Sequence, residues 1–236
     1  MSRIIFPLDV SDISEAEYFI KNLKEHVAMF KIGLELFYKT GCSWVKNIVE
    51  KENIRIFLDV KLHDIPNTVL GAVKNLLDLE PFFITVHLDE AKQFKKIVYN
   101  NTKFKGFLSV SFLTSLSDSD LHNLYVNENI TVTDYVLKKA EIALEAGCRG
   151  IVCAATEVKK VKDNFGDSLV VVTPGIRLKN VSVAGDDQKR IVTPYDAVIN
   201  GSDYLVIGRP IRTADNPIEV CNRINAEVDN ALKLKN

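Results

Sequence analysis

Short apolar runs alternate with longer amphipathic segments along this chain. The runs are rich in β-branched and aromatic residues and predict strands at residues 4–10, 29–32, 54–61, 82–87, 106–112, 150–153, 169–173 and 204–207. Apolar residues at helical spacing predict helices at residues 14–27, 67–77, 90–99, 132–146, 157–165, 194–200 and 217–234. The helix over 132–146 is expected to end at Gly147, because glycine often terminates a helix in the left-handed conformation.

Strands that alternate with helices form parallel βαβ units. Eight such units in a chain of 236 residues most simply close into a (β/α)8 barrel, the TIM barrel of the α/β class. A doubly wound open sheet is the alternative, but the G-x-G-x-x-G fingerprint after the first strand is missing. No Pro/Gly/Ser-rich linker divides the chain, so we expect a single barrel domain over residues 1–236.

Charge and composition exclude several classes of protein. Lys and Arg number 30 against 31 Asp and Glu, a balance that argues against a nucleic-acid-binding protein. The chain is 47% hydrophobic, which supplies a core, yet no apolar run has the length of a membrane span. The N-terminus lacks the features of a signal peptide, so we expect a cytoplasmic protein without membrane or nucleic-acid partners.

The cysteines and histidines give no sign of a metal site. Cys42, Cys148, Cys153 and Cys221 are too scattered for a disulfide framework, and we expect reduced, mostly buried thiols. The spacing of Cys148 and Cys153 is not that of a zinc ribbon, and the four histidines form no HExxH-type pair.

Charged residues gather at the predicted strand ends, where parallel barrels carry their chemistry. The polar residues at these ends are Asp9, Lys31, Asp59, Lys61, His87, Ser111, Thr173 and Arg209. Because strand side chains alternate between faces, Asp59 and Lys61 share one face, and the opposite face with Leu58 suits packing against helices. Asp59 and Lys61 should therefore point into the barrel and form an alternating network with Asp9 and Lys31.

Such a network has a structural and a functional interpretation. It could be a buried ion-pair cluster that only fixes packing, although apolar residues often replace such pairs without loss of stability. It could instead be a preorganised field in which a protonated lysine stabilises a developing carbanion and delivers a proton to it. Asp64 could equally be a solvated turn residue, and Asn67 or Thr68 could cap the helix that Pro66 introduces.

The last two strands end in loops that suit a phosphate group. Gly208 permits close approach of a backbone N–H to an anion, and Arg209 offers a bidentate guanidinium. The seventh strand is followed by Pro174 and Arg177 and then by a long polar loop through residues 185–190, which could close over a ligand. Alternatively, Gly208 could be a simple strand-to-helix turn, Arg209 a surface arginine and the long loop a flexible connector. Taken together, the two loops favour an organophosphate ligand.

With these residues in place, the chain resembles the orotidine 5′-phosphate decarboxylase family over nearly its whole length. The D-x-K-x-x-D core at Asp59 is shared with related barrels that act on sugar phosphates, and the more specific motifs are D-I-P-N-T, P-G-I-R, D-Q and I-G-R-P. The remaining matches are Leu8-Asp9, Phe30-Lys31-Ile32-Gly33 and Leu113-Thr114-Ser115. After the fourth strand the family commonly has small residues, whereas this chain has His87-Leu88-Asp89-Glu90, with His87 expected to be structural.

The resemblance implies decarboxylation of orotidine 5′-monophosphate to uridine 5′-monophosphate and CO2, the last step of de novo UMP synthesis, without a metal or organic cofactor. Lys61 would protonate C6 of the pyrimidine, and Asp59 and Asp64 would act on the departing carboxylate. The implied catalytic residues are Lys61, Asp59, Asp64 and Lys31. The implied substrate-binding residues are Asp9, Lys31, Thr68, Thr114, Pro174, Arg177, Gln188, Gly208 and Arg209.

The resemblance also implies a homodimer in which Asp64 and Thr68 reach into the partner subunit's site. Two other functions compete with this one. A metal-dependent sugar-phosphate lyase of the same barrel type, such as a hexulose-phosphate synthase, shares the D-x-K-x-x-D core, and a catalytically silent barrel could bind nucleotides as a regulator. A Ser-His-Asp hydrolase is poorly supported, because no G-x-S-x-G motif is present.

Overall fold

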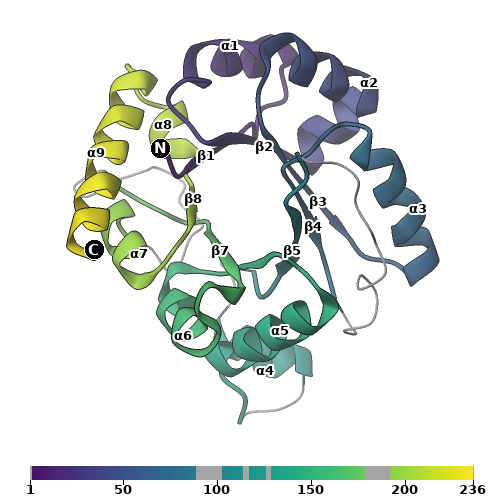
Figure 1. Ribbon diagram of the computed structural model, residues 1–236, viewed down its shortest axis with the longest axis vertical. Helices are drawn as coiled ribbons and strands as arrows, with labels where there is room; N and C mark the ends of the chain where they lie inside the picture. Colours follow the sequence, from purple (N-terminus) through teal and green to yellow (C-terminus); the bar gives the residue numbers. More distant parts are fainter. Residues whose placement is uncertain (1, 89–102, 114–116, 126–128, 179–191, 236) are drawn as a thin grey trace.

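Eight parallel strands form a closed barrel in the computed structural model, which describes residues 2–88, 103–113, 117–125, 129–178 and 192–235. Each strand pairs with the next along the chain, and the last strand pairs with the first to close the ring (Figure 1). The strands are β1 (Ile4–Pro7), β2 (Met29–Gly33), β3 (Ile56–Leu62), β4 (Phe83–Val86), β5 (Gly106–Val110), β6 (Gly150–Val152), β7 (Val170–Thr173) and β8 (Tyr204–Val206). The predicted TIM barrel and its eight strands are confirmed.

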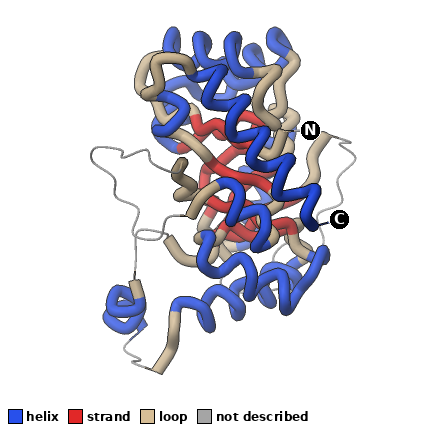
Figure 2. The backbone as a smooth tube through the Cα atoms, turned by 90° about the vertical axis from the view of Figure 1, so that its left-hand side faces the viewer, coloured by secondary structure: helices blue, strands red, loops and turns tan. Residues whose placement is uncertain are grey.

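Helices surround the barrel on its outer side (Figure 1), and the side view shows the strands enclosed between them (Figure 2). They are α1 (Ile13–Leu23), α2 (Leu34–Glu52), α3 (Pro66–Leu77), α4 (Asp118–Tyr125), α5 (Val132–Ala146), α6 (Ala155–Phe165), α7 (Pro194–Asn200), α8 (Arg209–Arg212) and α9 (Pro217–Lys235), with a 3-10 turn at Gly166–Ser168. The helix predicted over 90–99 lies outside the described residues.

The core has an inner and an outer layer, as alternation along the strands requires. Inward-facing side chains fill the barrel with Ile5, Met29, Phe57, Phe83, Leu108 and Val172. Alternate residues such as Leu58 and Ile84 pack outward with the helices, and Val60 and Leu62 join this outer layer. Leu58, Val60 and Leu62 therefore pack on the side predicted from the sequence.

Helix caps explain why several predicted boundaries are correct. Thr131 and Asp134 form a reciprocal capping box at the start of α5, and Gly147 ends the helix with φ of 81°. Thr193 caps α7 ahead of Pro194, and Gly201 ends that helix in the left-handed conformation.

Other helix predictions are corrected by the structure. The pattern did not predict α2, whose apolar periodicity is broken at Gly41, where the backbone has φ of 67° and the helix kinks. It also missed the short helices α4 and α8 and extended α1 beyond Leu23. Neither Asn67 nor Thr68 caps α3: the cap position is Ile65, without a side-chain bond, because Pro66 takes the first helical turn, where no N–H is needed.

Candidate active site

The predicted charged residues meet at the carboxyl ends of the first three strands. Lys31 of β2 is level with Pro7 of β1, so Asp9 lies just beyond the strand end beside it. Asp59 of β3 is level with Gly33 of β2. Asp59 and Lys61 lie two residues apart on β3 and both face the cavity, as strand alternation predicts.

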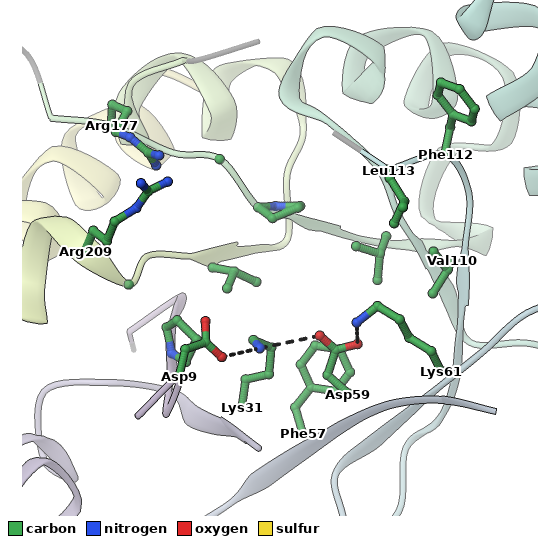
Figure 3. A pocket seen from close by; sticks show the side chains of 16 residues that line it. Asp9, Lys31, Phe57, Asp59, Lys61, Val110, Phe112, Leu113, Arg177 and Arg209 are labelled. Atoms are coloured by element: carbon green, nitrogen blue, oxygen red, sulfur yellow. Dashed lines mark hydrogen bonds and ion pairs between the residues drawn. The ribbon is translucent and has the colours of Figure 1, made fainter. Parts of the chain in front are cut away.

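These four side chains form one continuous chain of alternating charge (Figure 3). The Nζ of Lys31 lies 2.9 Å from Oδ1 of Asp9 and 3.5 Å from Oδ2 of Asp59. The Nζ of Lys61 lies 2.8 Å from Oδ1 of Asp59. Asp59 thus contacts both ammonium groups, one with each carboxylate oxygen, and the network predicted from the sequence is present.

The network becomes more exposed toward its two ends. The side chains of Lys31 and Asp59 are 11% and 15% exposed, whereas those of Asp9 and Lys61 are 58% and 32% exposed. Burial acts to lower the pKa of Lys31, but the charges of Asp59 and Asp9 outweigh it and raise the pKa. Burial acts to raise the pKa of Asp59, but Lys31 and Lys61 outweigh it and lower the pKa.

The ion pairs face a cavity of about 280 Å³ at the mouth of the barrel. The apolar residues that line it are Phe57, Val110, Phe112, Leu113 and Val152. This combination of apolar lining and a few convergent charges is typical of a small-molecule site.

The far side of the cavity carries two arginines, Arg177 in the loop after β7 and Arg209 at the start of α8, which follows β8. The guanidinium groups of Arg177 and Arg209 point toward each other across the rim (Figure 3). Pro174 and Gly208 also line the cavity. Two cations that converge on one space favour an anion there, and guanidinium groups match the geometry of phosphate.

Glycine leaves space for close contacts at two positions around the cavity. A Cβ added at Gly33 would lie 3.1 Å from Nζ of Lys31 and 3.4 Å from Oδ1 of Asp9, so glycine leaves room for this ion pair. A Cβ at Gly208 would lie 2.8 Å from Cγ of Pro7, so glycine lets the last loop approach the first strand.

Not every predicted site residue reaches this cavity. Asp64 and Thr68 are exposed and are not among its described lining residues. The carboxylate of Asp64 accepts a hydrogen bond of 2.7 Å from the N–H of Ile65 in the turn before α3. Thr114 and Gln188 lie outside the described residues.

Sequence reasoning missed one residue that contacts the network directly. Thr85 of β4 is fully buried, and its hydroxyl donates to Oδ1 of Asp59 at 3.0 Å and accepts from the N–H of Lys61 at 2.9 Å. Its inward position beside Phe83, two residues earlier, could have been read from strand alternation. Its role in the site could not be predicted from the sequence, because threonine is common in strands that have no functional part.

Within the described ranges, no group of three or more His, Cys, Asp or Glu side chains is placed to hold a metal ion. No helix in the same part of the chain is both long and apolar enough to cross a membrane.

Comparison with known proteins identifies the family of this chain. The model of the "Orotidine 5'-phosphate decarboxylase / HUMPS family" matches residues 2–224. The chain belongs to this family. An orotidine 5′-phosphate decarboxylase from Desulfosudis oleivorans is 41% identical over 234 residues, covering 98% of this chain and 94% of that protein. Another, from Syntrophus aciditrophicus, is 38% identical over 245 residues and covers 100% of this chain and 96% of its own.

A solved structure supports the same assignment, and a more distant one shows the same fold. The crystal structure of orotidine 5′-phosphate decarboxylase from Lactobacillus acidophilus aligns with a TM-score of 0.80 and 32% identity, covering 97% of this chain and all of that one. The corresponding protein from Pyrococcus horikoshii, at 21% identity and a TM-score of 0.72, shares the fold. The resemblance stated from the motifs is therefore confirmed.

The ion network predicts how stability depends on pH. The pKa of Asp59 is lowered from 3.8, so its contribution to stability is present above that value and is lost as pH falls through the folded-state pKa. Asp59→Asn should lower the free energy of unfolding by about 3 kcal/mol at neutral pH, because two ammonium groups lose a buried partner. The difference from wild type should shrink below pH 3.8, measured by urea unfolding across the acid range.

Asp163→Asn is the matched control, because Asp163 forms an exposed pair with Lys159 on α6. That substitution should change the free energy of unfolding by less than about 1 kcal/mol. A difference between wild type and Asp59→Asn that stayed constant down to the acid limit would contradict a role for ionised Asp59.

Proposed function

We propose that this chain decarboxylates orotidine 5′-monophosphate to uridine 5′-monophosphate and CO2, the last step of de novo UMP synthesis. The observation that carries the proposal is the Asp9–Lys31–Asp59–Lys61 network facing a cavity with two arginines on its far side. Relatives named for this activity match nearly the whole chain and support the choice of substrate.

The proposed reaction places the reacting carbon beside Lys61. The bond between C6 and the carboxylate breaks, CO2 leaves, and the electron pair stays on C6 in the ring plane, where no carbonyl group delocalises it. The ammonium of Lys61 stabilises this charge and transfers one proton to C6, and the neutral amine then regains a proton from solvent. Because the charge develops only as the bond breaks, this contact raises turnover rather than ground-state binding.

Asp59 has two parts in this proposal. Its carboxylate lies 2.8 Å from Nζ of Lys61, which keeps the ammonium directed into the cavity. Its negative charge also disfavours a substrate carboxylate in the same space, and Asp64 would add to that effect from the partner subunit. Lys31 and Asp9 would hold the ribose hydroxyls and orient the network.

Binding energy for alignment would come from the other end of the substrate. Arg177 and Arg209 would bind the phosphate, together with the backbone at Gly208 and with Gln188. Thr114 would line the base side or the loop side of the ligand, and Pro174 would also contact the substrate. The binding energy of a phosphate remote from the reacting carbon can be used to orient the reacting atoms. This would explain why the site has two separate charged ends.

The homodimer is part of the proposal. Ile65 lies between Asp64 and Pro66 and is 68% exposed, and Leu113 at the cavity mouth is 48% exposed. Large apolar side chains at the same end of the barrel as an incomplete site support an interface that brings Asp64 and Thr68 of one subunit to the cavity of the other. A single domain over residues 1–236 and a cytoplasmic location also remain proposals.

The activity is tested with purified protein and orotidine 5′-monophosphate in excess chelator, following the loss of ultraviolet absorbance of the substrate. We expect full turnover, because the proposed chemistry uses only side chains. A metal-dependent sugar-phosphate lyase would leave this substrate untouched in chelator. Tight UMP binding without release of CO2 would indicate a silent nucleotide-binding barrel instead.

Site sharing is tested by mixing inactive subunits. Subunits with Asp64→Asn and subunits with Lys61→Ala should each be impaired alone, yet a mixed dimer would contain one site with both residues intact. A one-to-one mixture should therefore recover about a quarter of wild-type activity in a random assembly.

The control for this experiment mixes Asp59→Asn with Lys61→Ala subunits. These two residues are neighbours on β3 of one chain, so each site of the mixed dimer keeps one defect and no activity should return. If the Asp64→Asn mixture also recovered nothing, Asp64 would not act across the interface.

A further inference from the structure

We infer that Thr85 is a positioning residue for the reaction, because its single hydroxyl fixes both the Asp59 carboxylate and the backbone that carries Lys61. The inference rests on the proposed function for its kinetic consequence. The supporting observations are two hydrogen bonds of the Thr85 hydroxyl, one of 3.0 Å to Asp59 and one of 2.9 Å from the N–H of Lys61.

The hydroxyl of Thr85 uses both of its hydrogen-bonding capacities on the network. It donates to Oδ1 of Asp59 and accepts from the N–H of Lys61. Thr85 is 0% exposed, so water does not compete for these bonds. One neutral group on β4 thereby ties the acid to the backbone of the lysine two residues further along β3.

The backbone of Lys61 needs such a contact. Its φ is 47°, in the left-handed region, which a lysine rarely adopts and which persists only where the surroundings hold it. The pairing of β3 with β4 shifts register between Leu58 and Leu62, so Lys61 lies in the irregular part of the ladder. Its N–H bonds to the threonine side chain instead of a strand carbonyl.

The hydrogen bond from Thr85 to Asp59 fixes which carboxylate oxygen faces each lysine. Oδ1 receives the hydroxyl of Thr85 and the ammonium of Lys61, while Oδ2 faces Lys31 at 3.5 Å. A donor fixed on β4 resists rotation of the carboxylate. Without it, Asp59 could turn and share its oxygens differently between the two lysines, and Nζ of Lys61 would lose its fixed direction.

Thr85→Val removes the hydroxyl while it preserves shape and burial. We expect kcat for orotidine 5′-monophosphate to fall at least about tenfold, since small misplacements of reacting groups are costly, while the Kd for UMP stays within about threefold. Thr85→Ser should recover most of the lost kcat, because it restores the hydroxyl. Should Thr85→Val fail to fold, Thr85→Ala takes its place with the same expectations.

Thr173→Val is the matched control. Thr173 is also a fully buried strand threonine, but its hydroxyl lies 2.6 Å from that of Ser202 and makes no contact with the network. That variant should keep wild-type kcat, even if its melting temperature falls. A kcat within twofold of wild type for Thr85→Val, or an equal loss in both valine variants, would overturn the inference.

A measurement without turnover separates this inference from the proposed function. The carboxyl carbon of Asp59 can be titrated by nuclear magnetic resonance in both valine variants. Thr85→Val should raise the pKa of Asp59, because the Thr85 hydrogen bond favours the charged form, whereas Thr173→Val should not. If wild type proved inactive on this substrate, a raised pKa would still support the positioning role, and an unchanged pKa would overturn it.

Discussion

The shared carboxylate of Asp59 is the contact on which the site depends. It lies between two ammonium groups, at 3.5 Å from Lys31 and 2.8 Å from Lys61, and it is largely buried. Removing Asp59 would leave the two ammonium groups without this partner and would lower the stability of the fold. Removing the two lysines would leave the buried carboxylate of Asp59 uncompensated, which also costs stability. Because the group is nearly neutral in sum, the barrel can hold four charges at its mouth and still direct one ammonium into an apolar-walled cavity.

Much of the fold follows from the sequence because its causes are local. Short apolar runs rich in β-branched and aromatic residues predicted all eight strands, and capping residues fixed the ends of α5 and α7. The pattern failed where tertiary structure decides. In α2 the helix continues through a kink at Gly41, and α8 has only four residues, too few for any periodicity.

The site could be predicted where strand alternation fixes the face to which a side chain points. Asp59 and Lys61 share a face for that reason, and the ends of neighbouring parallel strands bring Lys31 and Asp9 beside them. The left-handed backbone of Lys61 and the contacts of Thr85 depend on a register shift between β3 and β4, which no local pattern encodes. Asp64 needs a second subunit before its proposed role can be seen, and the single chain leaves it exposed.

The proposed mechanism requires the ammonium of Lys61 for the chemical step and not for binding or folding. The most direct measurement compares Lys61→Ala with wild type for decarboxylation of orotidine 5′-monophosphate, with calorimetric binding of UMP measured on the same samples. We expect turnover to fall by several orders of magnitude in Lys61→Ala, with folding intact and UMP still bound. Near-native turnover by the folded variant would contradict it.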